Sequence, residues 1–520
     1  MLRKVTGNPP LFSTAFFEPV RVLFLNSPAS SLSTFLSECL DLVSREPKIL
    51  ERIEADQDIY GKNKKKRRLL DQKWELSQNP KLCDIHLNST EIKADELSLQ
   101  SGCPRMAPLL VYLFLMLRGR FGGLKTQEMQ LLLQESVSLE VFFHNFGLKK
   151  LPGSSTIVDN INSVNQKTLD FIFESQIRMI IEEKLDDFKD LTFDSTSVSA
   201  NSAWPTDSAL LMGLVQRIYH RGKQLHKFEM PDIRERRFPN IIKTLTRLNK
   251  EIQLCGGRRG SKSKRKKRYR QLLKESESAH RTFSQEMKRV NKNLEKLNIA
   301  PSRYEMLVRL IDWMEDDLSW LSRVIEYCSK RVLLEERVDS KDKKMSLSDK
   351  SAGFIRKGGR DDVIGYKPQL GRSKNGFIPG LRVPQGNAAD SAEFVKIAAE
   401  SMERTGVIAE TISVDDGYAS KDARDKLFEM GVKIVSISGS KGKKIIDEQS
   451  WESQEYLQAR NDRSAVESLM FTIKHGYNFG RVMRRGLENV AAELLEKVLA
   501  YNFCRVIEIR KRKYLEKLVA

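Results

Sequence analysis

The sequence has few of the residues and motifs that mark several protein classes. Six cysteines are spread over 520 residues, at positions 39, 83, 103, 255, 328 and 504, and no close pair suggests a disulfide framework. Cys83 and His86 have metal-like spacing, but no second pair follows, so we do not predict a zinc site. The six histidines are dispersed and form no nucleophilic triad, and no P-loop or GxGxxG fingerprint is present.

Long apolar runs are also missing. The strongest run, Met106–Leu117, is shorter than the ~20 residues that a membrane-spanning helix needs, so we expect a buried helix there. Residues 1–25 are interrupted by prolines and charges and lack the apolar core of a signal peptide. We therefore predict a soluble, cytoplasmic protein without a membrane partner, associated with the nucleoid when it binds DNA.

Positive charge is abundant. The chain has 89 Lys and Arg residues against 69 Asp and Glu residues, a net charge of +20. This excess favours a polyanionic partner such as nucleic acid over an unrelated basic enzyme. Two basic runs, residues 62–68 and 258–270, are candidates for contacts with the DNA backbone, although each could be only a solvated face. The candidate contact residues in these runs are Lys64, Lys65, Lys66, Arg67, Arg68, Lys264, Arg265, Lys266, Lys267 and Arg268.

Periodicity divides the chain into helical and α/β parts. Residues 1–188 are predicted to be mainly helical, and 208–344 to be a helical insertion whose charged part forms an exposed helix or helical hairpin. The predicted strands are Leu191–Ser199, Gly353–Arg356, Gly365–Leu370, Gly376–Val383, Ala409–Val414 and Val432–Ile437. The predicted helices that follow the insertion are Ser391–Thr405, Lys421–Met430, Asp462–Lys474 and Gly486–Cys504.

This order of elements predicts an α/β fold with a ribonuclease H-like core, a mixed sheet flanked by helices. The core would comprise 189–207 and 345–505. It would have a helical N-terminal region (1–188), whose short helices are typical of either a DNA-binding domain or a plain bundle, a large helical insertion after the first strand, and a basic C-terminal tail (506–520).

Three carboxylates lie where such a core would bring them together. Asp194 lies in the first strand, Asp415 ends a later strand, and Glu467 lies on a helix after the last strand. Phosphodiester cleavage by two metal ions needs hard oxygen ligands on rigid elements, which these acids would supply. Asp415 and Asp416 are adjacent, so the residues alone leave the choice between them open. Two further acids, at positions 207 and 390, are rivals that helix capping explains equally well.

The helix around Glu467 carries two cations on the same face. Arg463, Glu467 and Lys474 are separated by four and seven residues, so all three project from one side. Glu467 could bind a metal while Arg463 and Lys474 contact DNA phosphates. The alternative is an Arg–Glu pair on a surface helix, worth ~0.3–0.5 kcal/mol.

Four sequence blocks, in this order, resemble those of bacterial and archaeal insertion-sequence DDE transposases, whose catalytic core is ribonuclease H-like. The blocks are Phe193–Thr196 with Trp204–Ser208; Gly365–Lys367 through Pro384–Asn387 with Asp390; Val414–Tyr418; and Arg463–Glu467 through Lys474, followed by Arg485–Leu487 and Asn502. In the third block the family's ligand is the aspartate two residues before the glycine, which selects Asp415. One departure is Arg460, where the family's signature often has tyrosine.

The resemblance implies an enzyme that cuts DNA at the ends of a mobile element and joins them to target DNA. Asp194, Asp415 and Glu467 would be the catalytic residues and hold two Mg²⁺ ions, for which Mn²⁺ can substitute. The implied partners are double-stranded DNA, as terminal inverted repeats and as target, and a second copy of the chain in a homodimer. The alternatives are a catalytically silent DNA-binding derivative and a metal-dependent nuclease that never joins strands.

Overall fold

A computed structural model describes most of the chain: residues 32–78, 106–145, 152–204, 206–230, 237–255, 261–294, 296–339, 343–356 and 362–519. Two compact units are present. The sheet unit comprises Met1–Tyr60, Pro104–Asn201 and Ser351–Ala520, and the bundle unit comprises Gly61–Cys103 and Ser202–Lys350. The N-terminal helices up to residue 60 therefore share one unit with the sheet.

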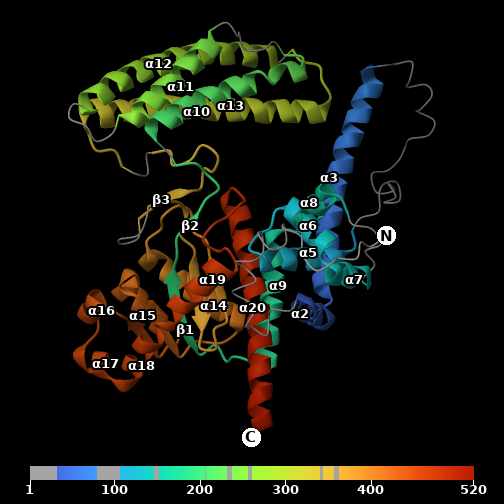
Figure 1. Cartoon of the computed structure of the whole chain (residues 1–520), viewed down its shortest axis with the longest axis vertical. Helices are drawn as coiled ribbons and strands as arrows, with labels where there is room; N and C mark the ends of the chain where they lie inside the picture. Colours follow the sequence, from blue (N-terminus) through green and yellow to red (C-terminus); the bar gives the residue numbers. More distant parts are fainter. Residues whose placement is uncertain are drawn as a thin grey trace, which may run out of the picture. The chain divides into compact units, whose positions relative to one another are not determined.

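A five-stranded mixed sheet is the centre of the sheet unit, with the strand order β6-β5-β1-β7-β8 (Figure 1). Its strands are β1 (Asp190–Ser195), β5 (Gln369–Ser373), β6 (Gly380–Arg382), β7 (Thr411–Val414) and β8 (Ile434–Ile437). The β1–β5 and β5–β6 pairs are antiparallel, whereas β1–β7 and β7–β8 are parallel. This topology, with helices on the sheet, is compatible with the predicted ribonuclease H-like core.

Helices pack on this sheet. Helix α14 (Asp390–Thr405) contacts β1, β5 and β6, and α18 (Gln454–Asp462) contacts β7 and β8. Helix α19 (Ala465–Gly476) contacts β1. Two of these helices, α18 and α19, belong to the chain segment that follows the last strand, so this segment returns to the sheet.

A second sheet of three short strands, in the order β2-β4-β3, corrects two sequence predictions. Its strands are β2 (Val198–Ser199), β4 (Val363–Tyr366) and β3 (Gly353–Ile355). The strand predicted over Leu191–Ser199 is therefore two strands in different sheets, and so is the one predicted over Gly365–Leu370. The break between β4 and β5 contains Pro368, which has no N–H to donate to a sheet ladder.

The long last helix, α20 (Leu487–Val519), contacts helices from the N-terminal part of the sheet unit. Figure 1 shows it beside α9. Its partners are α2 (Leu32–Arg45), α5 (Pro108–Arg120) and α9 (Gln166–Glu182). Residues 506–519, predicted as a basic tail, continue α20. The other N-terminal helices are α3 (Lys48–Gln78), α6 (Thr126–Glu135), α7 (Val137–Asn145) and α8 (Ser154–Ser163).

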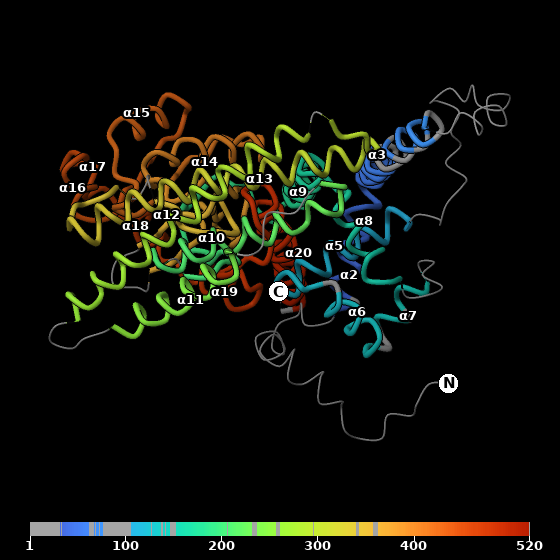
Figure 2. Tube along the Cα trace, turned by 90° about the horizontal axis from the view of Figure 1, so that it is seen from above, coloured from blue at the N-terminus to red at the C-terminus, as the bar shows by residue number. Residues whose placement is uncertain are grey.

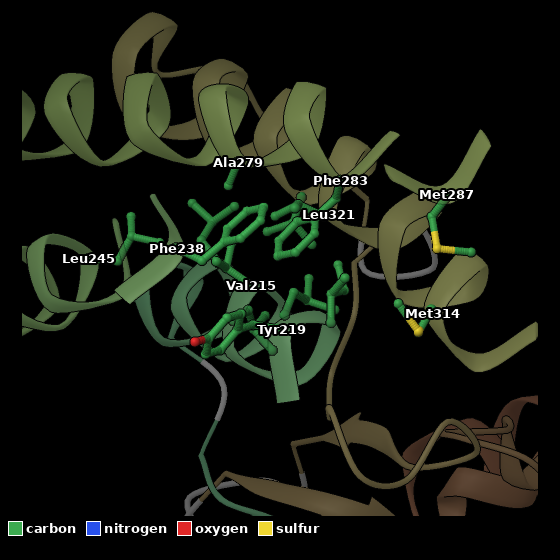
Figure 3. Close-up of a cluster of buried hydrophobic side chains, with 14 of the residues drawn as sticks. Val215, Tyr219, Phe238, Leu245, Ala279, Phe283, Met287, Met314 and Leu321 are labelled. Atoms are coloured by element: carbon green, nitrogen blue, oxygen red, sulfur yellow. The ribbon is translucent and has the colours of Figure 1, made fainter. Parts of the chain in front are cut away.

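The bundle unit is built on four helices that run side by side in both views (Figures 1 and 2). They are α10 (Asp207–Gly222), α11 (Phe238–Leu254), α12 (Ser261–Leu294) and α13 (Pro301–Cys328). The helices share one apolar core, in which the rings of Phe238 and Phe283 stack with centroids 4.1 Å apart (Figure 3).

Helix α12 is more buried than its charged sequence indicates. Its buried side chains recur every three or four residues, so they line one narrow stripe on an otherwise polar helix. They include Tyr269, Leu272, Ser276, Ala279, Phe283, Met287 and Val290. The predicted exposed helix is therefore a member of a packed bundle. Within the described part of the chain, every helix is too short or too polar to cross a lipid bilayer.

Candidate active site

Two of the predicted acids, Asp194 and Asp415, lie on neighbouring parallel strands at the same level of the sheet. The ladder between β1 and β7 pairs Asp190 with Thr411 and Thr192 with Ser413. The ladder ends at this second pair, and Asp194 and Asp415 each lie two residues further along, with Asp415 directly after β7. Both acids therefore lie at the carboxyl ends of neighbouring parallel strands, and adjacent strands are about 4.8 Å apart.

Alternation along β1 places Asp194 on the sheet face that α18 and α19 cover. Thr192 lines a shared cavity with Ala459 of α18 and Ala465 of α19. Side chains two residues apart lie on the same face of a strand, so Asp194 lies on the face of Thr192. Asp415 lies one residue beyond β7, whose Ser413 hydroxyl donates a hydrogen bond to the carbonyl of Ala459 (2.8 Å). Asp194 is 9% exposed.

The adjacent acids Asp415 and Asp416 have different surroundings. The Asp415 carboxylate accepts a hydrogen bond from the backbone N–H of Gly417 (2.9 Å). The Asp416 carboxylate accepts from the backbone N–H groups of Lys441 (2.8 Å) and Gly442 (3.0 Å), in the first turn of α16 (Ser440–Ile445). Asp416 therefore caps α16, whereas Asp415 accepts from the turn at Gly417.

The rival acid Asp390 lies close to the same strand ends. It is the first residue of α14, and its carboxylate accepts hydrogen bonds from Lys367 Nζ and Gln369 Nε2, both at 2.8 Å. A Cβ atom on Gly417 would lie 3.0 Å from Asp415 Oδ1 and 3.2 Å from Asp390 Oδ2. Both carboxylates therefore lie next to Gly417, a proximity that helix capping does not explain.

Tyr418 connects these acids. Its side chain is fully buried, and its hydroxyl donates to Gln369 Oε1. Burial raises the pKa of Tyr418 well above its ordinary value, and the charges of Asp390, Asp194 and Asp415 raise it further. The hydroxyl therefore lies within the field of all three acids. Burial alone would raise the pKa of Asp390, but its hydrogen bonds and the Lys367 charge outweigh burial and lower it.

The third predicted acid, Glu467, is on the surface. It lies in the first turn of α19, its side chain is 69% exposed, and Arg463 Nη2 is 3.8 Å from its Oε1. The helix predicted over Asp462–Lys474 is divided: Arg463 caps the end of α18, two residues before α19 begins, and its side chain is 22% exposed. Lys474, in the last turn of α19, is half-buried. Among the residues that the structure describes, no group of three His, Cys, Asp or Glu side chains is arranged to hold a metal.

The second rival acid, Asp207, belongs to the bundle unit. It is the first residue of α10 and pairs with Arg331 (3.0 Å). The predicted N-cap role falls one residue earlier, because the Thr206 hydroxyl accepts from the N–H of Ala209 (3.2 Å). Asp207 has a structural role in the bundle.

The second basic run lies at the start of α12, and much of it is engaged within the protein. Lys266 pairs with Glu335 (2.5 Å), Arg268 pairs with Glu251 (2.6 Å), and Arg265 donates to a backbone carbonyl. Lys264 and Lys267 are exposed.

In the first basic run, Arg67 is exposed and lies 3.5 Å from Glu305. The side chains of Lys64, Lys65, Lys66 and Arg68 lie outside the described residues.

Comparison with known families bears on this geometry. Residues 308–503 match the family described as "Transposase DDE domain". The chain carries a transposase DDE domain. This confirms the resemblance to insertion-sequence DDE transposases inferred from the sequence blocks. No curated protein and no solved structure matches the chain.

The matched transposase domain contains Asp390, Asp415 and Glu467, whereas Asp194 precedes it. The ladders of β1 with β5 and with β7 join the earlier strand to the matched region. The sequence patterns were enough to identify Asp194 and Asp415 as candidates. No pattern in the sequence around Asp390 indicated that it lies close to them. That proximity depends on the start of α14 and the end of β7 meeting at one edge of the sheet.

Proposed function

We propose that the protein is a transposase that cuts DNA at the ends of a mobile element and joins the freed ends to target DNA. The observation that carries the proposal is that Asp194 and Asp415 lie at the carboxyl ends of the paired strands β1 and β7, in a chain whose residues 308–503 match the transposase DDE domain. Their oxygen atoms form a hard donor set on rigid strands, which fits a divalent cation such as Mg²⁺ or Mn²⁺.

In this proposal Asp194 and Asp415 hold one side of a two-ion site, and Glu467 completes it from α19. When bound, the ions would supply Lewis-acid stabilisation of charge on the scissile phosphate. Arg463, at the end of α18, and Lys474, on α19, would bind the neighbouring phosphates. The DNA backbone would lie at the carboxyl edge of the sheet, where the carboxylates would reach its phosphates only through the bound cations.

We further propose that the basic runs bind the DNA backbone and that two copies of the chain pair the element ends. In the second run Lys264 and Lys267 are the better candidates, because Lys266 and Arg268 are already neutralised by acids. Such contacts release counterions, so binding should weaken as salt is raised.

A cleavage assay tests the function. The full-length protein is incubated, with and without Mg²⁺, with a plasmid carrying the genomic DNA that flanks its gene on both sides. We expect Mg²⁺-dependent cuts at the element ends, which Asp194→Asn and Asp415→Asn abolish. Asp190→Asn is the matched control, because Asp190 lies at the other end of the same strand and is half-exposed.

Strand joining is tested separately with pre-cut ends and a target plasmid. Joined products support a transposase, whereas cutting without joining would indicate a metal-dependent nuclease. DNA binding without any metal-dependent cutting would contradict catalysis and favour a silent DNA-binding derivative.

A further inference from the structure

A chain of hydrogen bonds close to Asp194 and Asp415 joins the start of β5, the start of α14 and the short helix that follows β7. Lys367 Nζ and Gln369 Nε2 donate to the two oxygens of Asp390, and the Tyr418 hydroxyl donates to Gln369 Oε1. Lys367 precedes β5, Gln369 begins β5, Asp390 begins α14, and Tyr418 ends the short helix η5 (Asp416–Tyr418).

These side chains are shielded from water, so their hydrogen bonds are costly to break. Gln369 and Tyr418 are fully buried, and the side chains of Lys367 and Asp390 are 11% and 12% exposed. A buried donor or acceptor that loses its partner pays a desolvation cost. The arrangement of β5, α14 and η5 is therefore strongly constrained at this point.

The same chain reaches both acids of the candidate site through the backbone. The N–H of Tyr418 donates to the carbonyl of Asp415 (3.1 Å), so the position of Tyr418 helps to set that of Asp415. Gln369 is the ladder partner of Ser195, the residue after Asp194. One hydrogen-bonded chain thus ends beside each acid.

We propose that Asp390 is a positioning residue: through Gln369 and the Tyr418 hydroxyl it fixes the turn that presents the Asp415 carboxylate beside Asp194. The inference rests on the proposed metal-dependent function. Asp390 itself already accepts two hydrogen bonds, one from a lysine, which suits it to hold a structure in place. Supporting residues of this kind typically change metal affinity about 10–100-fold when they are replaced.

The test measures Mn²⁺ affinity of the full-length protein by electron paramagnetic resonance of the free ion, together with the unfolding temperature. We expect Tyr418→Phe and Asp390→Asn each to weaken Mn²⁺ binding about 10-fold or more. The matched control is Tyr112→Phe, because Tyr112 is also fully buried and its hydroxyl donates to the carbonyl of Cys39 (3.1 Å) far along the chain from these acids. The control should lower stability by a similar amount and leave Mn²⁺ affinity unchanged.

The double variant Tyr418→Phe/Asp390→Asn shows whether the two residues act through one path. A shared path predicts that the double variant loses no more affinity than the weaker-binding single variant. Losses that multiply would overturn the inference, as would normal Mn²⁺ binding by Tyr418→Phe. Weakening by Asp390→Asn alone would also overturn it, since Asp390 would then act directly on the cation.

Two further variants separate failure of this inference from failure of the proposed function. If Asp194→Asn and Asp415→Asn abolish Mn²⁺ binding while the positioning variants bind normally, the metal site stands and only the role of Asp390 is refuted. If all four variants bind Mn²⁺ like the natural sequence, the acids do not hold the cation and the proposed chemistry fails as well.

Discussion

Replacing Glu467 by glutamine separates a catalytic role from a structural one, because the fold barely uses this side chain. In its ion pair with Arg463, Arg463 Nη2 lies 3.8 Å from Glu467 Oε1, and the Glu467 side chain is 69% exposed. Two unit charges about 4 Å apart in water attract by only ~1 kcal/mol, and side-chain entropy offsets most of that. Glu467→Gln should therefore change the free energy of unfolding by no more than about 0.5 kcal/mol.

The effect on DNA cleavage should be much larger. Loss of a supporting residue costs about 10–100-fold in activity, so loss of a metal ligand should lower the cleavage rate by at least about 100-fold. The readouts are the single-turnover cleavage rate on pre-assembled element ends and the urea midpoint of unfolding. We expect an unchanged midpoint and a nearly abolished rate.

The chain offers a closely matched control on α20. Arg512 and Glu516 have the same four-residue spacing, the same 3.8 Å separation and a similarly exposed glutamate, at 67%. Glu516→Gln should therefore have the same small effect on stability and none on cleavage. A Glu467→Gln protein that cuts DNA as fast as Glu516→Gln would refute the assignment of Glu467 as a metal ligand.

Further predictions concern the packing of α20 and the basic run of α12. Glu496→Gln should cost about 3–5 kcal/mol in urea unfolding, because buried Glu496 pairs with Arg118 (2.6 Å), which would lose its partner. Burial alone would raise the pKa of Glu496, but the nearby arginines lower it below its ordinary 4.5, so its contribution is complete above that pH. This contribution is lost as the pH falls through the lowered pKa that Glu496 has in the folded protein. Measuring the free energy of unfolding of the natural and Glu496→Gln proteins at decreasing pH checks this. Equal acid sensitivity of the two proteins would contradict it. Gly119→Ala should destabilise by ~1–3 kcal/mol or more, because its Cβ would lie 2.2 Å from the Glu496 carbonyl oxygen; an unchanged melting temperature would contradict this close packing. Replacing Lys264 and Lys267 by alanine should reduce the salt slope of DNA binding by about one unit each, measured by fluorescence anisotropy, and an unchanged slope would remove both from the interface.

Local sequence patterns predicted much of the secondary structure. Three predicted elements agree with observed ones to within two residues. The predicted helix Ser391–Thr405 is α14, the predicted helix Lys421–Met430 is α15 (Lys421–Glu429), and the predicted strand Val432–Ile437 is β8. Apolar periodicity and caps are local signals, so such elements can be read without knowing their neighbours. The mixed sheet could be anticipated from element order, but the two breaks that separate β1 from β2 and β4 from β5 could not.

Residue types and local patterns identified the candidate acids: Asp194 in a strand, Asp415 or Asp416 at a strand end, and Glu467 on a helix. Which of them lie together depends on strand pairing and helix packing between residues hundreds of positions apart, so the folded chain was needed to show it. The pairing of β1 with β7 brings the strand ends that carry Asp194 and Asp415 side by side, α16 gives Asp416 a capping role, and the contact of α14 with η5 brings Asp390 close to Asp415. The role of Glu467 remains a prediction from its sequence motif. Its 69% exposed side chain results from how α19 packs on the sheet, which the spacing of residues within the motif could not indicate.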